Sequence, residues 1–320
     1  FIPQEYWNIY ANLKDEKSKK EFEARFYGKN GKKQEINSKE QVDQILKDIE
    51  KAKYIVSDIK KGEKKRNPAP PFTTSTMQQE ASRKLGFTLK KTMSVAQTLY
   101  EGVKIADRGT VGLITYMRTD STRISEEARA AAKTHIVLTY GEEFYENRYY
   151  KTNKDAQDAH EGIRPTYSDI EPDSVKDDLS KDQYKLYKLI YNRFMASQMK
   201  PAVYDTMAVN IKANEYDFKA NGQNLKFKGF MILYVEGTDE KEEQEAGMLP
   251  ALEENQEVKL IKINPKQSFT EPPARYTEAS LVKALEEKGI GRPSTYSPTI
   301  TTILERRYIE KEQRQLVPTE

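Results

Sequence analysis

The sequence contains no cysteine and only two histidines, His135 and His160, among its 320 residues. Disulfides, cysteine-ligated zinc sites, cysteine nucleophiles and metal sites built from several histidines are therefore excluded. A metal ion bound by this chain would need carboxylate ligands. No apolar run approaches the roughly 20 residues that span a bilayer, and no segment has the pattern of an export signal. The composition predicts a soluble chain without a membrane partner.

The charge of the chain is nearly balanced, with 53 basic and 50 acidic residues. A surplus of +3 is too small to identify nucleic acid as the partner. Basic residues gather over residues 53–66 and acidic residues over residues 236–257. Each charged stretch is as consistent with a solvated face as with a binding surface. The acidic stretch lies in a turn-rich segment, and we interpret it as solvated surface.

The hydrophobic pattern predicts a multidomain α+β protein. Polar and apolar residues alternate over three regions typical of strands: residues 21–28, 54–59 and from 202 onward. Helical spacing or capping residues mark residues 38–52, 77–85, 92–103, 125–138, 182–199, 277–288 and 297–307. Prolines at 68, 70 and 71 and at 272 and 273 indicate boundaries. We expect one β-rich domain interrupted by a helical one.

The most informative stretch covers residues 112–125 and reads GLITYMRTDSTRIS. Tyr116 ends a short apolar run that we interpret as a strand or a buried edge, and Arg118 follows two residues later. A phenol has a pKa of about 10, so it is a poor nucleophile at neutral pH unless a fixed cation stabilises the developing charge. A guanidinium binds phosphate through two parallel hydrogen bonds, so this pair can place a nucleophile and a clamp on one phosphodiester. Alone, the pair is weak evidence in a chain with 20 tyrosines.

The segment ITYMRTDST closely resembles the active-site signature of bacterial type IA DNA topoisomerases. Further blocks agree with that family in the same order: FIPQEYW at the start, PFTTSTMQQEASRKLGF over 71–87, AQDAHEGIRPT over 156–166 and PPARYTEASLVKALEEKGIGRPSTY over 272–296. The resemblance covers nearly the whole chain. Several ordered blocks with the expected separations exclude a chance match.

The resemblance implies a toroidal type IA core made of an arch, a tyrosine-bearing domain and a base. The β-rich arch would be discontinuous, over residues 13–72 and 201–272, and the helical domain with the catalytic tyrosine would be inserted over residues 73–200. Residues 1–12 and 273–320 would form part of a helical base domain. Phe1 is an unusual first residue, and the chain ends directly after an apolar turn, so we expect an excised fragment.

The resemblance also implies the reaction: relaxation of negatively supercoiled DNA without ATP, by single-strand cleavage, strand passage and religation. Tyr116 would form a 5′-phosphotyrosyl bond, Arg118 would hold the scissile phosphate, and His160 would lie near the tyrosine and support phosphate or leaving-group positioning. His160 fits a structural role as an alternative. Glu161 and Arg164 are expected to be architectural, holding their turn against Tyr116.

Contacts with single-stranded DNA are expected in two further blocks. At the start of a helix, Ser75, Gln78 and Gln79 can receive phosphates, although capping explains them equally well. In the last block the resemblance implies a DNA groove lined by Arg275, Thr277, Arg292, Ser294 and Thr295. Tyr276 and Tyr296 could stack on bases, but we expect them to pack in the core.

The family's N-terminal TOPRIM domain, with a glutamate general acid and an Asp-x-Asp-x-Asp cluster that binds Mg²⁺, has no counterpart in this sequence, and neither have its C-terminal zinc ribbons. We therefore expect no metal ligands here and no cleavage by the fragment alone. The expected protein is a cytoplasmic, nucleoid-associated monomer. Two rivals remain: a tyrosine recombinase, which would form a 3′-phosphotyrosine, and a non-catalytic clamp that only binds single-stranded DNA.

Overall fold

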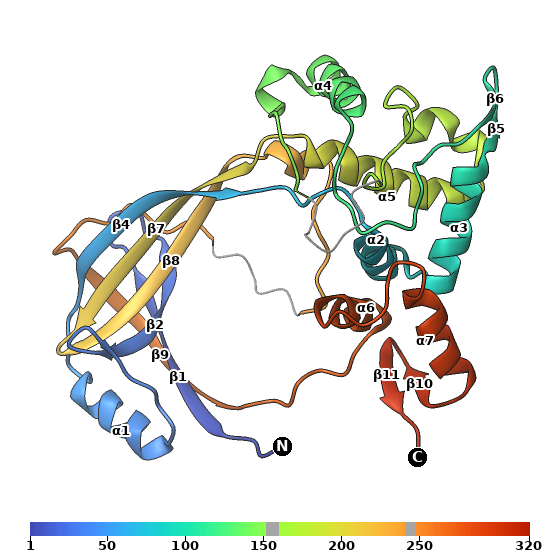
Figure 1. Cartoon of the computed structure of the whole chain (residues 1–320). Helices are drawn as coiled ribbons and strands as arrows, with labels where there is room; N and C mark the ends of the chain where they lie inside the picture. Colours follow the sequence, from blue (N-terminus) through green and yellow to red (C-terminus); the bar gives the residue numbers. More distant parts are fainter. Residues whose placement is uncertain (152–159, 241–246) are drawn as a thin grey trace. The chain divides into compact units, whose positions relative to one another are not determined.

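The computed structural model describes residues 1–151, 160–240 and 247–320, and the chain divides into two compact units (Figure 1). The first unit is rich in strands and contains Phe1–Lys65, Val203–Phe227 and Glu243–Ala274. The second is mainly helical and contains Arg66–Ala202, Lys228–Glu242 and Arg275–Glu320. The mixed α+β class expected from the sequence is confirmed.

A seven-stranded sheet forms the first unit, in the order β1-β9-β4-β7-β8-β2-β3. Because β1 also pairs with β2, six of these strands form a closed circuit, which is a barrel. The strands of the circuit are β1 (Glu5–Lys14), β2 (Glu21–Lys29), β4 (Tyr54–Arg66), β7 (Ala202–Ala213), β8 (Tyr216–Phe227) and β9 (Glu257–Phe269); β3 (Lys32–Lys33) follows β2. Strands distant in sequence therefore share one core.

The core of the barrel is built from the apolar face of each strand. Phe26 and Phe218 meet edge to face with 5.7 Å between ring centroids, and Tyr54 packs on Phe218 at 5.8 Å. Helix α1 (Lys39–Asp48) adds Val42 and Ile45 to this core. Each strand thus places alternate residues inward, which is the period-two pattern of the sequence.

Helix α1 begins at Ser38 as predicted from the sequence, with one difference in its cap. The Ser38 hydroxyl accepts a hydrogen bond from the Gln41 N–H at 3.3 Å. The Gln41 side-chain oxygen accepts from the N–H of Asn37 at 2.6 Å, one residue before the residue that a capping box requires. The cap still satisfies the first turn of the helix.

The expectation that residues 1–12 belong to a helical base domain is wrong. Residues Glu5–Lys14 form β1, which pairs with β9 and with β2 inside the barrel. Ile9, Ala11 and Leu13 are fully buried in its core. The sequence does carry the period-two pattern of this strand, since Trp7, Ile9, Ala11 and Leu13 alternate with Asn8, Tyr10 and Asn12. The expectation for residues 1–12 came from the family resemblance and not from this alternation.

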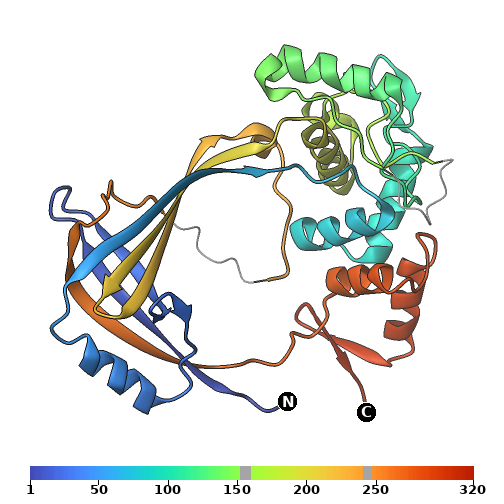
Figure 2. The same ribbon diagram turned by 60° about the vertical axis from the view of Figure 1, so that its left-hand side comes forward.

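The second unit consists of helices and two small hairpins, which Figure 2 shows from another direction. Its helices are α2 (Thr74–Glu80), α3 (Leu89–Glu101), α4 (Glu126–Tyr140), α5 (Lys181–Ser197), α6 (Glu278–Glu287) and α7 (Tyr296–Glu305), with a π-helical turn over Ala81–Leu85 and short 3₁₀ turns over Glu142–Phe144, Pro172–Asp178 and Gly229–Ile232. The hairpins are β5 (Val103–Ile105) with β6 (Gly109–Val111), and β10 (Ile309–Glu312) with β11 (Gln315–Pro318). Over the described residues, no helix has both the length and the apolar character to cross a membrane.

Residues 275–320 lie in the same compact unit as residues 66–202. A small core joins them, in which Leu89 of α3 contacts Val282 of α6 and Tyr296 and Ile300 of α7. The sequence blocks over residues 71–87 and 272–296 therefore meet in one unit, although about 190 residues separate them.

Candidate active site

The segment that carries Tyr116 and Arg118 is held on one side by the segment after His160. The Thr115 N–H donates to the Arg164 carbonyl at 2.9 Å, and the Thr115 hydroxyl donates to the Gly162 carbonyl at 3.0 Å. The Thr166 N–H donates to the Leu113 carbonyl at 2.9 Å. These bonds fix the backbone on either side of Ile114, which forms an isolated bridge with Pro165.

On its other side the same segment is held by the start of α2. The Thr74 N–H donates to the Thr119 carbonyl at 2.9 Å, and the Thr119 N–H donates to the Thr74 hydroxyl at 2.8 Å. The buried Thr74 hydroxyl also donates to the Met117 carbonyl at 2.6 Å. Three sequence blocks that are far apart in the chain therefore meet around Tyr116.

Of the two alternatives for the apolar run before Tyr116, a strand or a buried edge, the strand is wrong. Strand β6 ends at Val111, and residues 112–125 are irregular apart from the single bridge of Ile114. The apolar run is nevertheless buried, because Leu113, Ile114 and Met117 are each no more than 2% exposed. Up to residue 115 this segment is hydrogen-bonded to the segment after His160, and from residue 117 it is hydrogen-bonded to the start of α2. This change of partner prevents a regular ladder of strand hydrogen bonds.

The Tyr116 side chain is the exception in this buried run, since it is 39% exposed. Its ring lies edge to face against the Tyr100 ring of α3, with 5.3 Å between centroids and an angle of 62°. The His160 ring lies on it at 6.3 Å and 44°. The backbone of Tyr116 is therefore fixed while its phenol stays open to a substrate.

Arg118 is half-buried and lies beside α3. Its Nη1 donates to the Gln97 side-chain oxygen at 3.4 Å, and Gln97 in turn donates to Glu101 at 2.7 Å. The first bond is long and uses one of the five donors of a guanidinium. Arg118 is thus oriented by a weak contact that a phosphate can replace.

An ion pair braces the turn that follows His160. The Arg164 guanidinium donates from Nη2 to Glu161 Oε2 at 2.9 Å, and Glu161 Oε1 accepts from the Ser125 N–H at 2.6 Å. Burial disfavours the charged carboxylate, but these hydrogen bonds outweigh burial and lower the pKa of Glu161 below its ordinary value. The geometry agrees with the architectural role expected for Glu161 and Arg164. The preceding residues 156–159 of that block lie outside the described residues.

Three side chains expected to contact DNA are buried instead. Ser75, Gln78 and Gln79 are 2%, 0% and 6% exposed. Gln79 donates to the Ser75 hydroxyl at 2.9 Å, whereas both polar atoms of the Gln78 amide are buried without a hydrogen-bond partner among the described atoms. The alternative of simple capping is also wrong for them, since the capping box of α2 consists of Thr73 and Thr76.

Ser75 lines a cavity of about 560 Å³ beside the Tyr116 segment, and Gln78 and Gln79 are not part of the lining of this cavity. The lining combines the start of α2, residues 119–122 and the loop between α6 and α7. Its charged members are Asp120, Lys151, Arg193, Glu286 and Arg292. Arg193 is only 2% exposed and donates from Nε to the Pro70 carbonyl at 2.7 Å, whereas Lys151 and Arg292 are the exposed cations of this lining.

The residues of the last sequence block that were expected to contact DNA differ in how free their side chains are to bind it. The Thr277 hydroxyl caps α6 by accepting from the Ser280 N–H at 3.1 Å, and the Thr295 hydroxyl accepts from the Arg292 N–H at 2.8 Å. Arg275, Arg292 and Ser294 are exposed. Tyr296 is buried in the small core of α3, α6 and α7, as expected, whereas Tyr276 is 47% exposed.

Sequence reasoning missed Tyr100 and Gln97, which contact Tyr116 and Arg118. Both project from α3, three residues apart, so they lie on neighbouring positions of one helix face. Their spacing is ordinary for a helix, and no signal in the sequence distinguished them from other surface residues. Only the packing of α3 against the Tyr116 segment, which includes a bond of 2.9 Å from the Leu113 N–H to the Leu99 carbonyl, identifies them.

Comparisons with known proteins agree with this geometry. A family model described as DNA topoisomerase matches residues 1–320. The chain is also similar to the structure of full-length topoisomerase I from Thermotoga maritima, with 38% sequence identity and a TM-score of 0.81. The match covers 100% of this chain and 50% of the Thermotoga chain, so this chain spans half the length of that protein.

Proposed function

Because the chain belongs to the bacterial DNA topoisomerase family, we propose that it supplies the nucleophile and the phosphate contacts for a type IA reaction. The reaction relaxes negatively supercoiled DNA without ATP: one strand is cut, a second passes through the gap, and the first is rejoined. The substrate is a single-stranded segment of underwound duplex. The protein would act as a monomer in the cytoplasm, at the nucleoid.

In the cleavage step the Tyr116 phenol oxygen attacks the scissile phosphorus. A bond forms between that oxygen and phosphorus, and the bond from phosphorus to the deoxyribose 3′ oxygen breaks. The phenol loses its proton and the leaving 3′ oxygen gains one. Since one phosphodiester replaces another, little free energy is lost, and attack by the 3′-hydroxyl on the phosphotyrosine restores the strand.

Arg118 would bind the non-bridging oxygens of the phosphate as charge develops on them. Its present partner is the Gln97 amide at 3.4 Å, a neutral group that an anion readily displaces. His160 is exposed beside the Tyr116 ring and can donate a hydrogen bond to the phosphate or to the leaving group. These roles for Arg118 and His160 follow from the family resemblance and fit their positions.

The resemblance further implies Mg²⁺ and a glutamate acid, both in a TOPRIM domain. Among the residues that the structure describes, no three histidine, aspartate or glutamate side chains are grouped to hold a metal ion. We propose, from the family resemblance, that a TOPRIM domain holds the Mg²⁺. The exposed cations Lys151 and Arg292 of the cavity, with the exposed Arg275 and Ser294, are proposed to guide the single strand.

The observation that supports this proposal best is the contrast between a fixed backbone and an open phenol. Backbone bonds from the segments at Thr74 and at Arg164 hold the chain on both sides of Tyr116. A purely structural tyrosine in such a buried run would be buried too, as Leu113 and Met117 are. Tyr116 is 39% exposed beside His160, which suits a residue that meets a substrate.

The test is the capture of a covalent adduct on single-stranded DNA. The chain is mixed with an oligonucleotide and Mg²⁺, with and without a TOPRIM domain added as a separate polypeptide, and is then denatured. A 5′-phosphotyrosyl bond retains the 3′-labelled part of the DNA on the protein and releases the 5′-labelled part. We expect a 3′-labelled adduct that needs the added domain and is lost in Tyr116→Phe, with DNA binding retained.

The other outcomes identify the rivals. Retention of the 5′-labelled part would indicate a 3′-phosphotyrosine, as in a tyrosine recombinase. Binding without an adduct under either condition would leave a single-stranded DNA clamp as the function. An adduct that persists in Tyr116→Phe would show that another residue is the nucleophile.

A further inference from the structure

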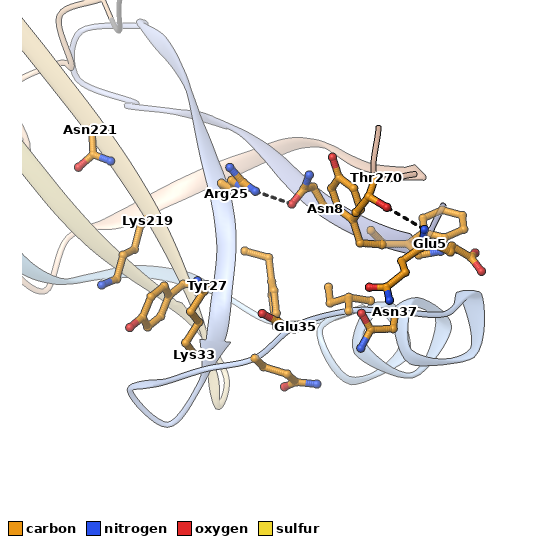
Figure 3. A pocket seen from close by; sticks show the side chains of 16 residues that line it. Glu5, Asn8, Arg25, Tyr27, Lys33, Glu35, Asn37, Lys219, Asn221 and Thr270 are labelled. Carbon is orange, nitrogen blue, oxygen red and sulfur yellow. Dashed lines mark hydrogen bonds between the residues drawn. The ribbon is translucent and has the colours of Figure 1, made fainter. Parts of the chain in front are cut away.

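Two neighbouring cavities of the barrel open on the same side of its sheet. One has a volume of about 590 Å³ and is lined by residues of β1, β2 and the segment 33–37, which Figure 3 shows in close view. The other has a volume of about 360 Å³ and is lined mainly by β7, β8 and the turn after β2. Both include Tyr27, Lys219 and Asn221. The two cavities therefore adjoin at these three residues, and we call their combined lining the barrel groove.

The strand register places a row of polar side chains across the barrel, and three of its members, Arg25, Lys219 and Asn210, line this groove. Tyr10 of β1 is paired with Arg25 of β2, and Arg25 is paired with Lys219 of β8. On the far side of β1, Tyr10 is paired with Asn264 of β9, and beyond β8 Lys219 is paired with Asn210 of β7. Five adjacent strands therefore contribute one member each, at a spacing of about 4.8 Å from strand to strand.

The row points away from the core of the barrel. Its members alternate with core residues along the strands: Ile9 and Ala11 flank Tyr10, Ala24 and Phe26 flank Arg25, and Phe218 and Ala220 flank Lys219. Because successive side chains of a strand point to opposite faces, the row lies on the outer face. Arg25, Lys219 and Asn264 are exposed accordingly.

The ring contact and the hydrogen bond made by the cationic side chains of the row involve neutral groups, so these cations remain available to a ligand. The Lys219 ammonium lies over the Tyr27 ring, 3.7 Å from the centroid. Arg25 donates from Nη2 to the Asn8 side-chain oxygen at 2.7 Å, a neutral partner (Figure 3). Tyr6 adds a ring that is 38% exposed. The groove thus offers aromatic faces, side-chain amides and two cations, Arg25 and Lys219, that form no ion pair with a carboxylate in the part of the chain that the structure describes.

Acidic side chains of the lining are partly engaged elsewhere. Asp217 is 1% exposed and accepts from the Gly31 N–H at 2.7 Å and from Asn210 at 3.0 Å. Glu5 accepts from the Trp7 indole and from Gln267, both at 2.9 Å. The other acidic members are Glu35 and Asp58, against the cations Arg25, Lys33, Lys60, Lys212 and Lys219. The charge of the groove therefore favours an anion.

We propose that the barrel groove is a second binding surface for single-stranded DNA, distinct from the Tyr116 segment. A sheet that presents rings, amides and cations in register suits unpaired bases, which stack on aromatic faces while cations contact the phosphates. The bases of a duplex are already stacked and paired, and an acidic peptide gives the rings nothing to stack on. A phosphate draws the flexible Lys219 side chain away from Tyr27 and frees that ring for a base. The choice of DNA rests on the family to which the chain belongs.

Photocrosslinking on the full chain tests the proposal. A single-stranded oligonucleotide with 5-iodouracil is bound to the Tyr116→Phe variant, irradiated and digested with trypsin. We expect a crosslink at Tyr27, in the peptide of residues 26–29, in addition to crosslinks from the helical unit. The double variant Arg25→Ala with Lys219→Ala should lose the barrel crosslink and lower the salt slope of binding by about 1.4, at roughly 0.7 per lost phosphate contact on a single strand.

Lys51→Ala is the matched control, because Lys51 is exposed on the same unit and lines neither cavity. It should leave the barrel crosslink in place. Crosslinks confined to the helical unit, or a double variant with the wild-type salt slope, would overturn the proposal. So would competition by duplex DNA or by polyglutamate as strong as that by single strands. Covalent adduct formation by Tyr116 is measured separately, so failure of either proposal is recognised independently.

Discussion

The ring of Tyr116 lies edge to face against the ring of Tyr100, with 5.3 Å between the two centroids. Tyr116 sits on an irregular segment and Tyr100 near the end of α3, so this contact links the proposed nucleophile to a rigid helix. On its other side the Tyr116 ring has only the exposed His160 as an aromatic neighbour among the described residues. Tyr100 is therefore the group that can restrict the phenol to a productive orientation.

We expect Tyr100→Ala to slow covalent adduct formation by about 3-fold to 10-fold, because an aromatic pair contributes about 0.5–1.5 kcal/mol beyond its buried area. Tyr100→Phe keeps the ring and should retain the wild-type rate. The measurement is the single-turnover rate of adduct formation at saturating oligonucleotide, in the presence of the TOPRIM domain. Equal rates for the alanine and phenylalanine variants would show that the contact does not position Tyr116.

Arg118→Lys should cause a large cleavage defect although the charge is kept. A lysine ammonium is a point charge, whereas the guanidinium donates two parallel hydrogen bonds to one phosphate. Oligonucleotide affinity, measured by fluorescence anisotropy, should change less than the cleavage rate. Cleavage at the wild-type rate would exclude Arg118 as the phosphate clamp. Arg108→Lys serves as a control, because Arg108 forms an exposed ion pair with Asp169 on the surface.

The sequence predicted the elements of this chain better than the contacts between them. The helix cap at Ser125 and the alternation in β7 are local signals, and the structure confirms the elements that they predict. The role of residues 1–12 was missed because it was taken from the family resemblance, although Trp7, Ile9, Ala11 and Leu13 alternate as in a strand. Such alternation indicates a strand but not its partner, and β1 pairs with β9, about 250 residues later.

The same limit applies to the candidate site. Tyr116, Arg118 and His160 were found from motifs, and the structure brings Tyr116 and His160 together. Gln78 and Gln79 were expected to contact phosphates because they lie at the start of a helix, yet tertiary packing buries them. Tyr100 and Gln97 belong to no motif. Burial and neighbours are properties of the packed unit, so residue type alone does not predict them.

The ion pair of Glu161 and Arg164 should make the site sensitive to acid. The pKa of Glu161 is lowered in the folded chain, so its contribution to stability is full above the ordinary value of 4.5 and is lost as the pH falls through the folded pKa. Glu161→Gln should raise the hydrogen-exchange rate of the Ser125 amide at pH 7 and weaken the acid dependence of that rate. The control Glu142→Gln replaces an exposed glutamate. Protection of Ser125 that is unchanged in Glu161→Gln would contradict the bracing role.

The last prediction concerns the buried Arg193, which holds two segments of the helical unit together. Its guanidinium donates to the Pro70 carbonyl at 2.7 Å and to Glu236 at 3.2 Å, and it lies 4.7 Å from the Phe72 ring centroid. Tyr234, another of its partners, donates to the fully buried Glu80.

Removing one member of a buried charged network costs about 3–5 kcal/mol, because the remaining groups lose their partners. Arg193→Met should therefore strongly destabilise the helical unit, measured as a lower urea midpoint by circular dichroism. The control Arg108→Met removes an ion pair whose side chains are 46% and 67% exposed. It should cost about 0–1 kcal/mol, since surface pairs contribute little. Similar urea midpoints for the two variants would show that burial does not strengthen the contacts of Arg193. A midpoint lowered only in Arg193→Met would identify this arginine as the main link between Pro70 and Glu236.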